Sequence, residues 1–89
     1  MTRVHLVIHG RVQGVGFRHF VTLEARALGL AGRVRNRADG TVEVEAEGGA
    51  GALDQLVGAV RRGPVGARIE RVEESFSEGT PRHRGFHSA

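Results

Sequence analysis

A glycine-rich stretch between a strand-like and a helix-like run constrains this fold most. It spans Gly10–Arg18 and reads GRVQGVGFR. Before it, Val4, Leu6 and Ile8 recur at every second position, which predicts a strand that buries these three residues. Glycines allow positive φ, and backbone N–H groups at a helix start converge on a point that suits an anion. Arg18 adds a planar donor fork for phosphate or carboxylate. The stretch predicts an oxyanion site, and the simpler alternative is a tight turn beside a surface arginine.

Two common phosphate-binding patterns do not fit this stretch. The P-loop requires a lysine near its end, but all 13 basic residues of this chain are arginines. The dinucleotide-binding pattern requires a third glycine five positions after the first, and five positions after Gly14 the chain has His19. A nucleotide site of either kind is therefore not expected.

Length and composition limit the remaining possibilities. With 89 residues, we expect a single domain over 1–89. The absence of cysteine excludes disulfides, thiolate metal ligands and thiol nucleophiles. The run Met1–His9 is too short and polar for a signal peptide, so we expect a cytoplasmic protein. The formal net charge is +3, which permits an acidic partner without selecting one.

Periodicity predicts the remaining elements. Phe20, Leu23, Ala27 and Leu30 recur at helical spacing, which predicts a helix that runs over at least 20–28, ends at Gly29 or Gly32, and has these residues on its buried side. Further along, the patterns predict strands over 32–36 and 41–47 joined by an Asp-Gly turn, a helix with Leu53, Leu56, Val57 and Val60 inward, a strand over 65–76 with a bulge near Glu70-Arg71, and a short edge strand over 85–89.

This order of elements, β-α-β-β-α-β, predicts the fold class. Short connections and right-handed crossovers favour an α+β, ferredoxin-like split β-α-β sandwich. We expect one antiparallel sheet with two helices on one face. Because this fold serves many functions, function must be argued from the site.

Two motifs together resemble the acylphosphatase family. Gly10–Arg18 meets the family pattern Gly-x-Val-Gln-Gly-Val-x-Phe-Arg at every fixed position. Gly32–Val42 meets the pattern Gly-aromatic-Val-x-Asn-x-x-x-Gly-x-Val except at the aromatic position, which is Arg33. The resemblance covers about residues 3 to 76.

The resemblance implies an activity and a set of site residues. The activity is hydrolysis of a small-molecule acyl phosphate to a carboxylate and inorganic phosphate, with no metal or other cofactor. Arg18 would bind phosphate and Asn36 would position water. We expect no nucleic-acid or membrane partner, and a monomer. The implied phosphate-binding residues are Gln13, Gly14, Val15, Gly16, Phe17 and Arg18.

These residues suit that chemistry. An acyl phosphate already carries a weakly basic leaving group, so positioning and charge stabilisation are the main tasks left to the protein. Arg18 and backbone N–H groups can stabilise phosphoryl oxygens. The Asn36 amide can hold a water in line. No obvious base is present, so our hypothesis is that a phosphate oxygen takes the water's proton.

Other residues have alternative interpretations. His19 could act as a base, or lie on the helix surface. His5 and His9 share one strand face and could bind a metal, although a third ligand is not evident. One arginine near Asn36 could attract substrate, or all three could simply face solvent; the three are Arg33, Arg35 and Arg37.

Two rival functions remain to be weighed. RNA-recognition domains share this topology and stack bases on sheet aromatics, but this chain has no Tyr or Trp, and none of its four phenylalanines falls on the two strands that carry such residues. A non-catalytic anion-sensing or regulatory domain would use the same loop, and Asn36 favours catalysis over it. The family's last strand is usually apolar, whereas this chain has Ser88, so we expect that strand to be short.

Overall fold

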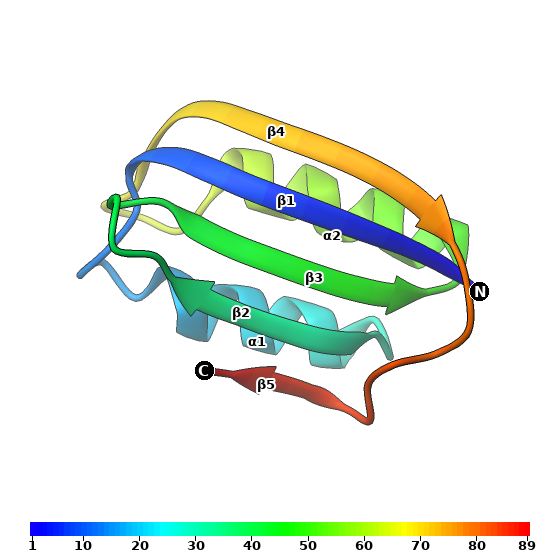
Figure 1. The fold of residues 1–89 in the computed structure, drawn as a ribbon. Helices are drawn as coiled ribbons and strands as arrows, with labels where there is room; N and C mark the ends of the chain where they lie inside the picture. Colours follow the sequence, from blue (N-terminus) through cyan, green and yellow to red (C-terminus); the bar gives the residue numbers. More distant parts are fainter.

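The chain forms a five-stranded sheet with two helices packed on one face (Figure 1). A computed structural model describes residues 1–89. No helix has the length and apolar character needed to cross a membrane. In chain order the elements are β1 (Thr2–Arg11), α1 (Phe17–Ala27), β2 (Ala31–Asn36), β3 (Val42–Gly48), α2 (Ala50–Arg62), β4 (Arg68–Glu78) and β5 (Phe86–Ser88).

The strand order across the sheet is β4-β1-β3-β2-β5. The first four strands pair antiparallel, as the ferredoxin-like prediction requires. The short β5 instead pairs parallel to β2, so the sheet is mixed and the expectation of a wholly antiparallel sheet was wrong for this edge. After β4 the chain passes around one end of the sheet to the opposite edge, and β5 therefore runs in the direction of β2 (Figure 1).

Helix α1 begins three residues earlier than predicted, and its buried face differs from the expected one. Phe17 is 1% exposed and Val21 and Ala25 are fully buried, whereas Leu23 is 54% exposed. The true stripe starts at Phe17 and repeats every four residues, so it lies beside the predicted stripe. Because glycine-rich loops seldom suggest helix, the first turn was missed.

The pairing of β1 with β4 contains a β-bulge at the place where the sequence predicted one. His9 pairs with Arg71 and Gly10 pairs with Ile69, which leaves Glu70 without an opposite residue. Gly10 has φ +131°, and a Cβ there would lie 2.0 Å from the Arg68 carbonyl oxygen. Only glycine allows β4 to approach β1 this closely. Because the bulge adds one residue to β4, the core-facing positions before and after it do not follow a single two-residue alternation.

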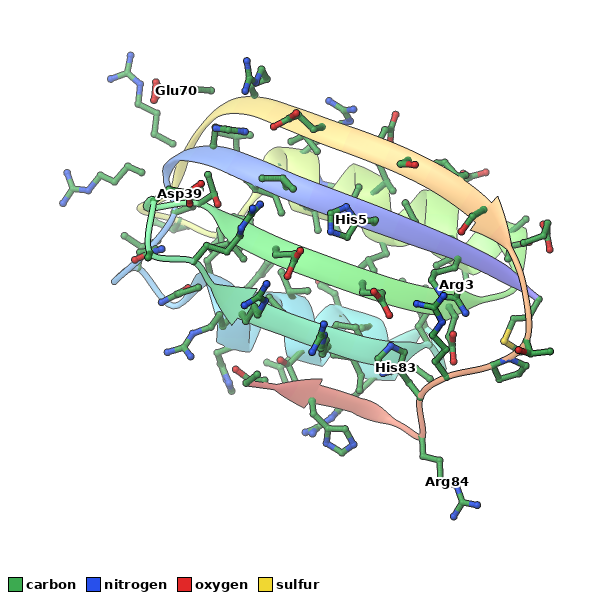
Figure 2. All side chains as sticks on the ribbon, viewed as in Figure 1. Arg3, His5, Asp39, Glu70, His83 and Arg84 are labelled. Atoms are coloured by element: carbon green, nitrogen blue, oxygen red, sulfur yellow. The ribbon has the colours of Figure 1, made fainter.

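The core lies between the sheet and the helices, while the other sheet face is open and charged. The predicted inward residues Val4, Leu6 and Ile8 are fully buried, as are Leu53 and Leu56 of α2. On the open face, side chains of β1 and β3 meet those of the connection between β4 and β5 (Figure 2).

One open-face carboxylate is buried. Glu47 is 2% exposed because that connection passes over it. Its oxygens accept the backbone N–H groups of Arg82 and His83, both at 2.8 Å, and a contact from the Arg3 guanidinium at 3.3 Å. Burial raises the pKa of Glu47, but these hydrogen bonds outweigh it and leave that pKa below its usual value. Glu47 therefore anchors the connection that leads to β5.

Candidate active site

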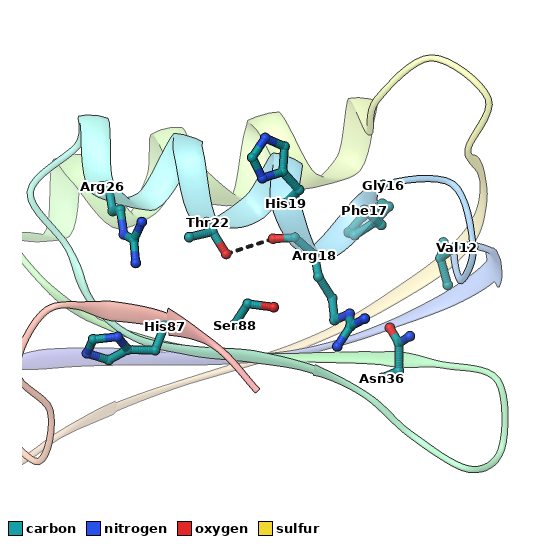
Figure 3. A pocket seen from close by; sticks show the side chains of 11 residues that line it. Val12, Gly16, Phe17, Arg18, His19, Thr22, Arg26, Asn36, His87 and Ser88 are labelled. Carbon is teal, nitrogen blue, oxygen red and sulfur yellow. Dashed lines mark hydrogen bonds between the residues drawn. The ribbon is translucent and has the colours of Figure 1, made fainter.

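A pocket of about 510 Å³ opens between the start of α1, the end of β2 and the edge strand β5 (Figure 3). No aspartate or glutamate lines it, although it contains two arginines and two histidines. Such a lining suits an anionic ligand. The lining residues are Val12, Gly14, Gly16, Phe17, Arg18, His19, Thr22, Arg26, Asn36, His87 and Ser88.

The loop before α1 depends on two glycine conformations. Gly14 has φ +74° and Gly16 has φ +77°, and neither has an atom within 4 Å of an added Cβ. Conformation rather than space therefore requires glycine at these positions. The first hydrogen bond at the start of α1 is donated by the Phe20 N–H to the Gly16 carbonyl oxygen at 3.0 Å. The preceding N–H groups are left for a ligand at this end of the helix, where its dipole is positive.

Gln13 ties this loop to the turn between β2 and β3. Its side-chain amide donates to the carbonyl oxygens of Arg37 at 2.8 Å and Thr41 at 2.9 Å. The turn is ordered in its own right, because the Asp39 carboxylate accepts the Thr41 N–H at 3.0 Å and the Thr41 hydroxyl at 2.6 Å. The hydroxyl contact is the main reason that the pKa of Asp39 lies below its usual value. These contacts bring Asn36, just before the turn, toward the loop.

Arg18 and Asn36 come from different elements and share the pocket. Asn36 ends β2 and has the same strand parity as buried Val34, so it lies on the helix side of the sheet. The Arg18 guanidinium points toward the Asn36 side chain (Figure 3). Its Nη1 donates to the backbone oxygen of Ala89, the last residue, at 2.8 Å, which orients the side chain and leaves other N–H donors available.

The pocket collects most of the residues predicted for the site. Gly14, Gly16, Phe17, Arg18 and Asn36 all line it. Two predicted phosphate-binding residues, Gln13 and Val15, do not line the pocket. The Gln13 side chain instead donates its hydrogen bonds to the turn between β2 and β3. The two motifs therefore meet in space, although this does not test the role of each residue.

Of the three arginines near Asn36, Arg33 and Arg35 face away from the pocket, and Arg37, in the turn after β2, does not line it. Arg33 and Arg35 lie on the open sheet face, opposite Glu45 and Glu43 in the β2–β3 register. Arg35 forms an ion pair with Glu43. Neither Arg33 nor Arg35 lines the pocket, so direct attraction of substrate by them is not supported.

The histidines fall into two groups. His5 contacts Glu43 at 2.8 Å and His9 contacts Glu73, so each has its own glutamate. No cluster of three or more potential metal ligands is present. His19 is exposed and lines the pocket, and its side chain leaves α1 in a different direction from that of Arg18 (Figure 3).

Sequence reasoning missed several lining residues. Thr22 and Arg26 follow Arg18 at four-residue intervals, a spacing that places them on one side of a helix. That spacing was present in the sequence, but the prediction of the site did not use it. Ser88 and His87 reach the pocket only because β5 pairs with β2, and no local pattern indicates this pairing.

Comparisons with known proteins identify the family of this chain. A family model described as acylphosphatase matches residues 4–88. The chain is 49% identical over 86 residues to an acylphosphatase of Azorhizobium caulinodans, covering 97% of this chain and 92% of that protein. It is 50% identical over 86 residues to one of Acidiphilium cryptum, covering 97% and 93%.

A solved structure supports the same assignment. The crystal structure of acylphosphatase from Bacillus subtilis superposes with a TM-score of 0.97 at 40% identity, covering 100% of this chain and 99% of that one. The family match, the level of identity and the shared fold all extend over nearly the whole chain. This chain therefore belongs to the acylphosphatase family.

Proposed function

We propose that this chain hydrolyses the carboxyl–phosphate anhydride bond of acyl phosphates through Arg18, Asn36 and the loop of residues 13–18, without a metal ion. Family membership supports the substrate class. The observation that carries the proposal is the meeting of the Arg18 side chain, the Asn36 amide and the start of α1 in one pocket that no aspartate or glutamate lines.

In this mechanism the loop and Arg18 bind the phosphoryl group. The backbone N–H groups at the start of α1 and the free Arg18 donors contact its non-bridging oxygens. Their positive charge offsets the charge that shifts within the transition state. Because these donors are oriented before substrate arrives, little reorganisation is needed at the moment of reaction.

Asn36 orients the nucleophile. Its amide can donate to and accept from a water, which places the water oxygen in line with the bond to be broken. The oxygen forms a bond to phosphorus while the bond from phosphorus to the acyl oxygen breaks, and the electron pair leaves with the carboxylate. One proton of the water passes to a phosphoryl oxygen, since no aspartate or glutamate lines the pocket to accept it.

The experiment that tests this proposal is hydrolysis of benzoyl phosphate, with and without a chelator, by the native chain and Arg18→Gln. We expect turnover that survives the chelator and is lost in Arg18→Gln. The matched control is Arg33→Gln, which removes an exposed arginine from the open face and should retain activity. Circular dichroism checks that each variant is folded.

The alternative function predicts a different result. A non-catalytic anion-sensing domain would bind inorganic phosphate at the same loop and would not hydrolyse benzoyl phosphate. Isothermal titration of the native chain with phosphate separates the two. Binding without turnover would reject hydrolysis, and activity that persists in Arg18→Gln would remove Arg18 from the mechanism.

A further inference from the structure

A second arginine lies in the same pocket as Arg18. Arg26 is two turns further along α1, so the two Cα atoms are about 12 Å apart along the helix axis. Both side chains line the pocket, and Arg26 stands at the end away from Asn36 (Figure 3). The pocket is therefore elongated, with one arginine toward each end.

Arg26 is held in place without being neutralised. Its Nε donates to the Phe86 carbonyl oxygen at 3.0 Å, and its two terminal nitrogens make no hydrogen bond or ion pair. No acidic residue stands three or four positions from it on α1, and none lines the pocket. Several other arginines of the chain do have carboxylate partners, namely Arg3, Arg35, Arg61 and Arg71.

The space between the two arginines is polar. Thr22 and Ser88 line it from α1 and β5, and Figure 3 shows both side chains between Arg18 and Arg26. The Thr22 hydroxyl donates to the Arg18 carbonyl oxygen at 2.7 Å, while the Ser88 hydroxyl has no partner within the protein. A pocket of about 510 Å³ also exceeds what a phosphoryl group alone would fill. An acyl group lying between Arg18 and Arg26 would meet hydroxyls rather than an apolar wall.

We infer that Arg26 binds a second anionic group, carried by the acyl part of the substrate. This inference rests on the proposed function and narrows its substrate class to acyl phosphates whose acyl group ends in a carboxylate or a phosphate. The phosphoryl group to be transferred lies at Arg18 and Asn36, and the second anion meets the terminal nitrogens of Arg26. Arg26 is a specificity-determining residue, since it stands away from the reacting atoms.

The test compares two substrates of similar size, 4-carboxybenzoyl phosphate and 4-methylbenzoyl phosphate. The native chain should have the higher kcat/KM for the carboxylated substrate. In Arg26→Gln this preference should fall by about fivefold or more, mainly through KM, because a charge-assisted hydrogen bond is lost. The kcat/KM for the methyl substrate should change by less than about twofold, as expected where the lost group makes no contact with it.

Two further variants separate charge at this position from other effects. Arg26→Lys keeps the charge and should retain most of the preference. Arg62→Gln removes an equal charge from the exposed end of α2, outside the pocket, and should leave the preference unchanged. Raising the ionic strength should weaken the native preference and have little effect on Arg26→Gln. An equal loss for both substrates in Arg26→Gln would show that Arg26 only supports β5, and would overturn the inference.

Binding of analogues that cannot be hydrolysed tests the Arg26 subsite without depending on catalysis. Calorimetry with 4-carboxybenzylphosphonate and 4-methylbenzylphosphonate measures the same preference without turnover. Hydrolysis of both acyl phosphates with no preference in either assay would reject the Arg26 subsite and leave the proposed function intact. A binding preference that depends on Arg26, with no hydrolysis, would reject the proposed function and leave the anion subsite intact.

Discussion

Asn36 is held by its position in the sheet rather than by partners of its own. It ends β2 on the helix side, next to the turn that Gln13 clamps, and its amide makes no hydrogen bond within the protein. The amide is therefore available to a water. In Asn36→Ala we expect kcat for benzoyl phosphate to fall by about 10²-fold or more, as for the loss of one preorganised group. Inhibition by inorganic phosphate should be nearly unchanged, because the proposed phosphate contacts are Arg18 and the loop rather than Asn36.

Gln55→Ala is the matched control for Asn36→Ala. It removes an exposed amide from α2, outside the pocket, and should preserve kcat. If Asn36→Ala instead weakened phosphate inhibition and left kcat intact, Asn36 would be a phosphate ligand and the water-positioning role would be withdrawn.

At the scale of elements, glycines divide into those that the backbone requires and those that it does not. Gly10 has φ +131°, and a Cβ added to it would meet the Arg68 carbonyl oxygen at 2.0 Å, whereas Gly51 lies in α2 with open space around it. Gly10→Ala should destabilise the fold by about 2 kcal/mol or more, because β4 must move away from β1. Gly51→Ala should stabilise it by about 0.5–1 kcal/mol through helix propensity.

Urea unfolding of the native chain and both variants measures the two opposite changes in the free energy of unfolding. The two changes each add one methyl group, so their chemistry is matched and only the backbone setting differs. A Gly10→Ala variant as stable as the native chain would contradict the close approach of β4 to β1 at the bulge.

Across the whole molecule, carboxylates on the open sheet face link stability to pH. The pKa values of Glu43, Glu45 and Glu47 all lie below the usual 4.5. A histidine hydrogen bond is the main cause for Glu43 (His5) and Glu45 (His83). Because the ionised form is favoured in the folded state, this stabilisation is present above about pH 4.5 and is lost as pH falls through the lowered values. We expect the free energy of unfolding to decrease on acidification in that range.

The variant Glu47→Gln measures how much the buried Glu47 carboxylate contributes to the pH dependence of stability. At pH 7 the variant should be less stable than the native chain by about 2 kcal/mol or more, because Arg3 and two backbone N–H groups lose a charged partner. The difference should be smaller at pH 3 than at pH 7, because acidification shifts the native Glu47 toward its protonated form. Urea unfolding at both pH values is the measurement. The control is Glu70→Gln, at an exposed glutamate whose side chain makes no hydrogen bond, and it should have little effect on stability at either pH. If Glu47→Gln lowered the free energy of unfolding equally at both pH values, the proposed dependence of stability on Glu47 ionisation would be contradicted.

Much of the fold could be predicted because strong local patterns agree with tertiary packing. The strict alternation around Val42 and Val44, and the helical spacing of Leu53, Leu56 and Val60, coincide with the buried positions observed. The prediction failed at the start of α1, where Phe17 follows three glycines and the local signal indicates a loop. Burial of the Phe17 ring favours helix there, and that is a tertiary effect.

Local sequence patterns were sufficient to predict the element order, the bulge and the two motifs of the site, because these depend on residues near one another in the chain. Which other residues line the pocket depends on tertiary packing and could not be predicted in this way. The parallel pairing of β5 with β2 brings Ser88 to the pocket, and the packing of α1 beside β5 places Arg26 in the same pocket as Arg18. Both arrangements depend on contacts between distant segments, whose free energy comes from burial and long-range hydrogen bonds rather than from local preference.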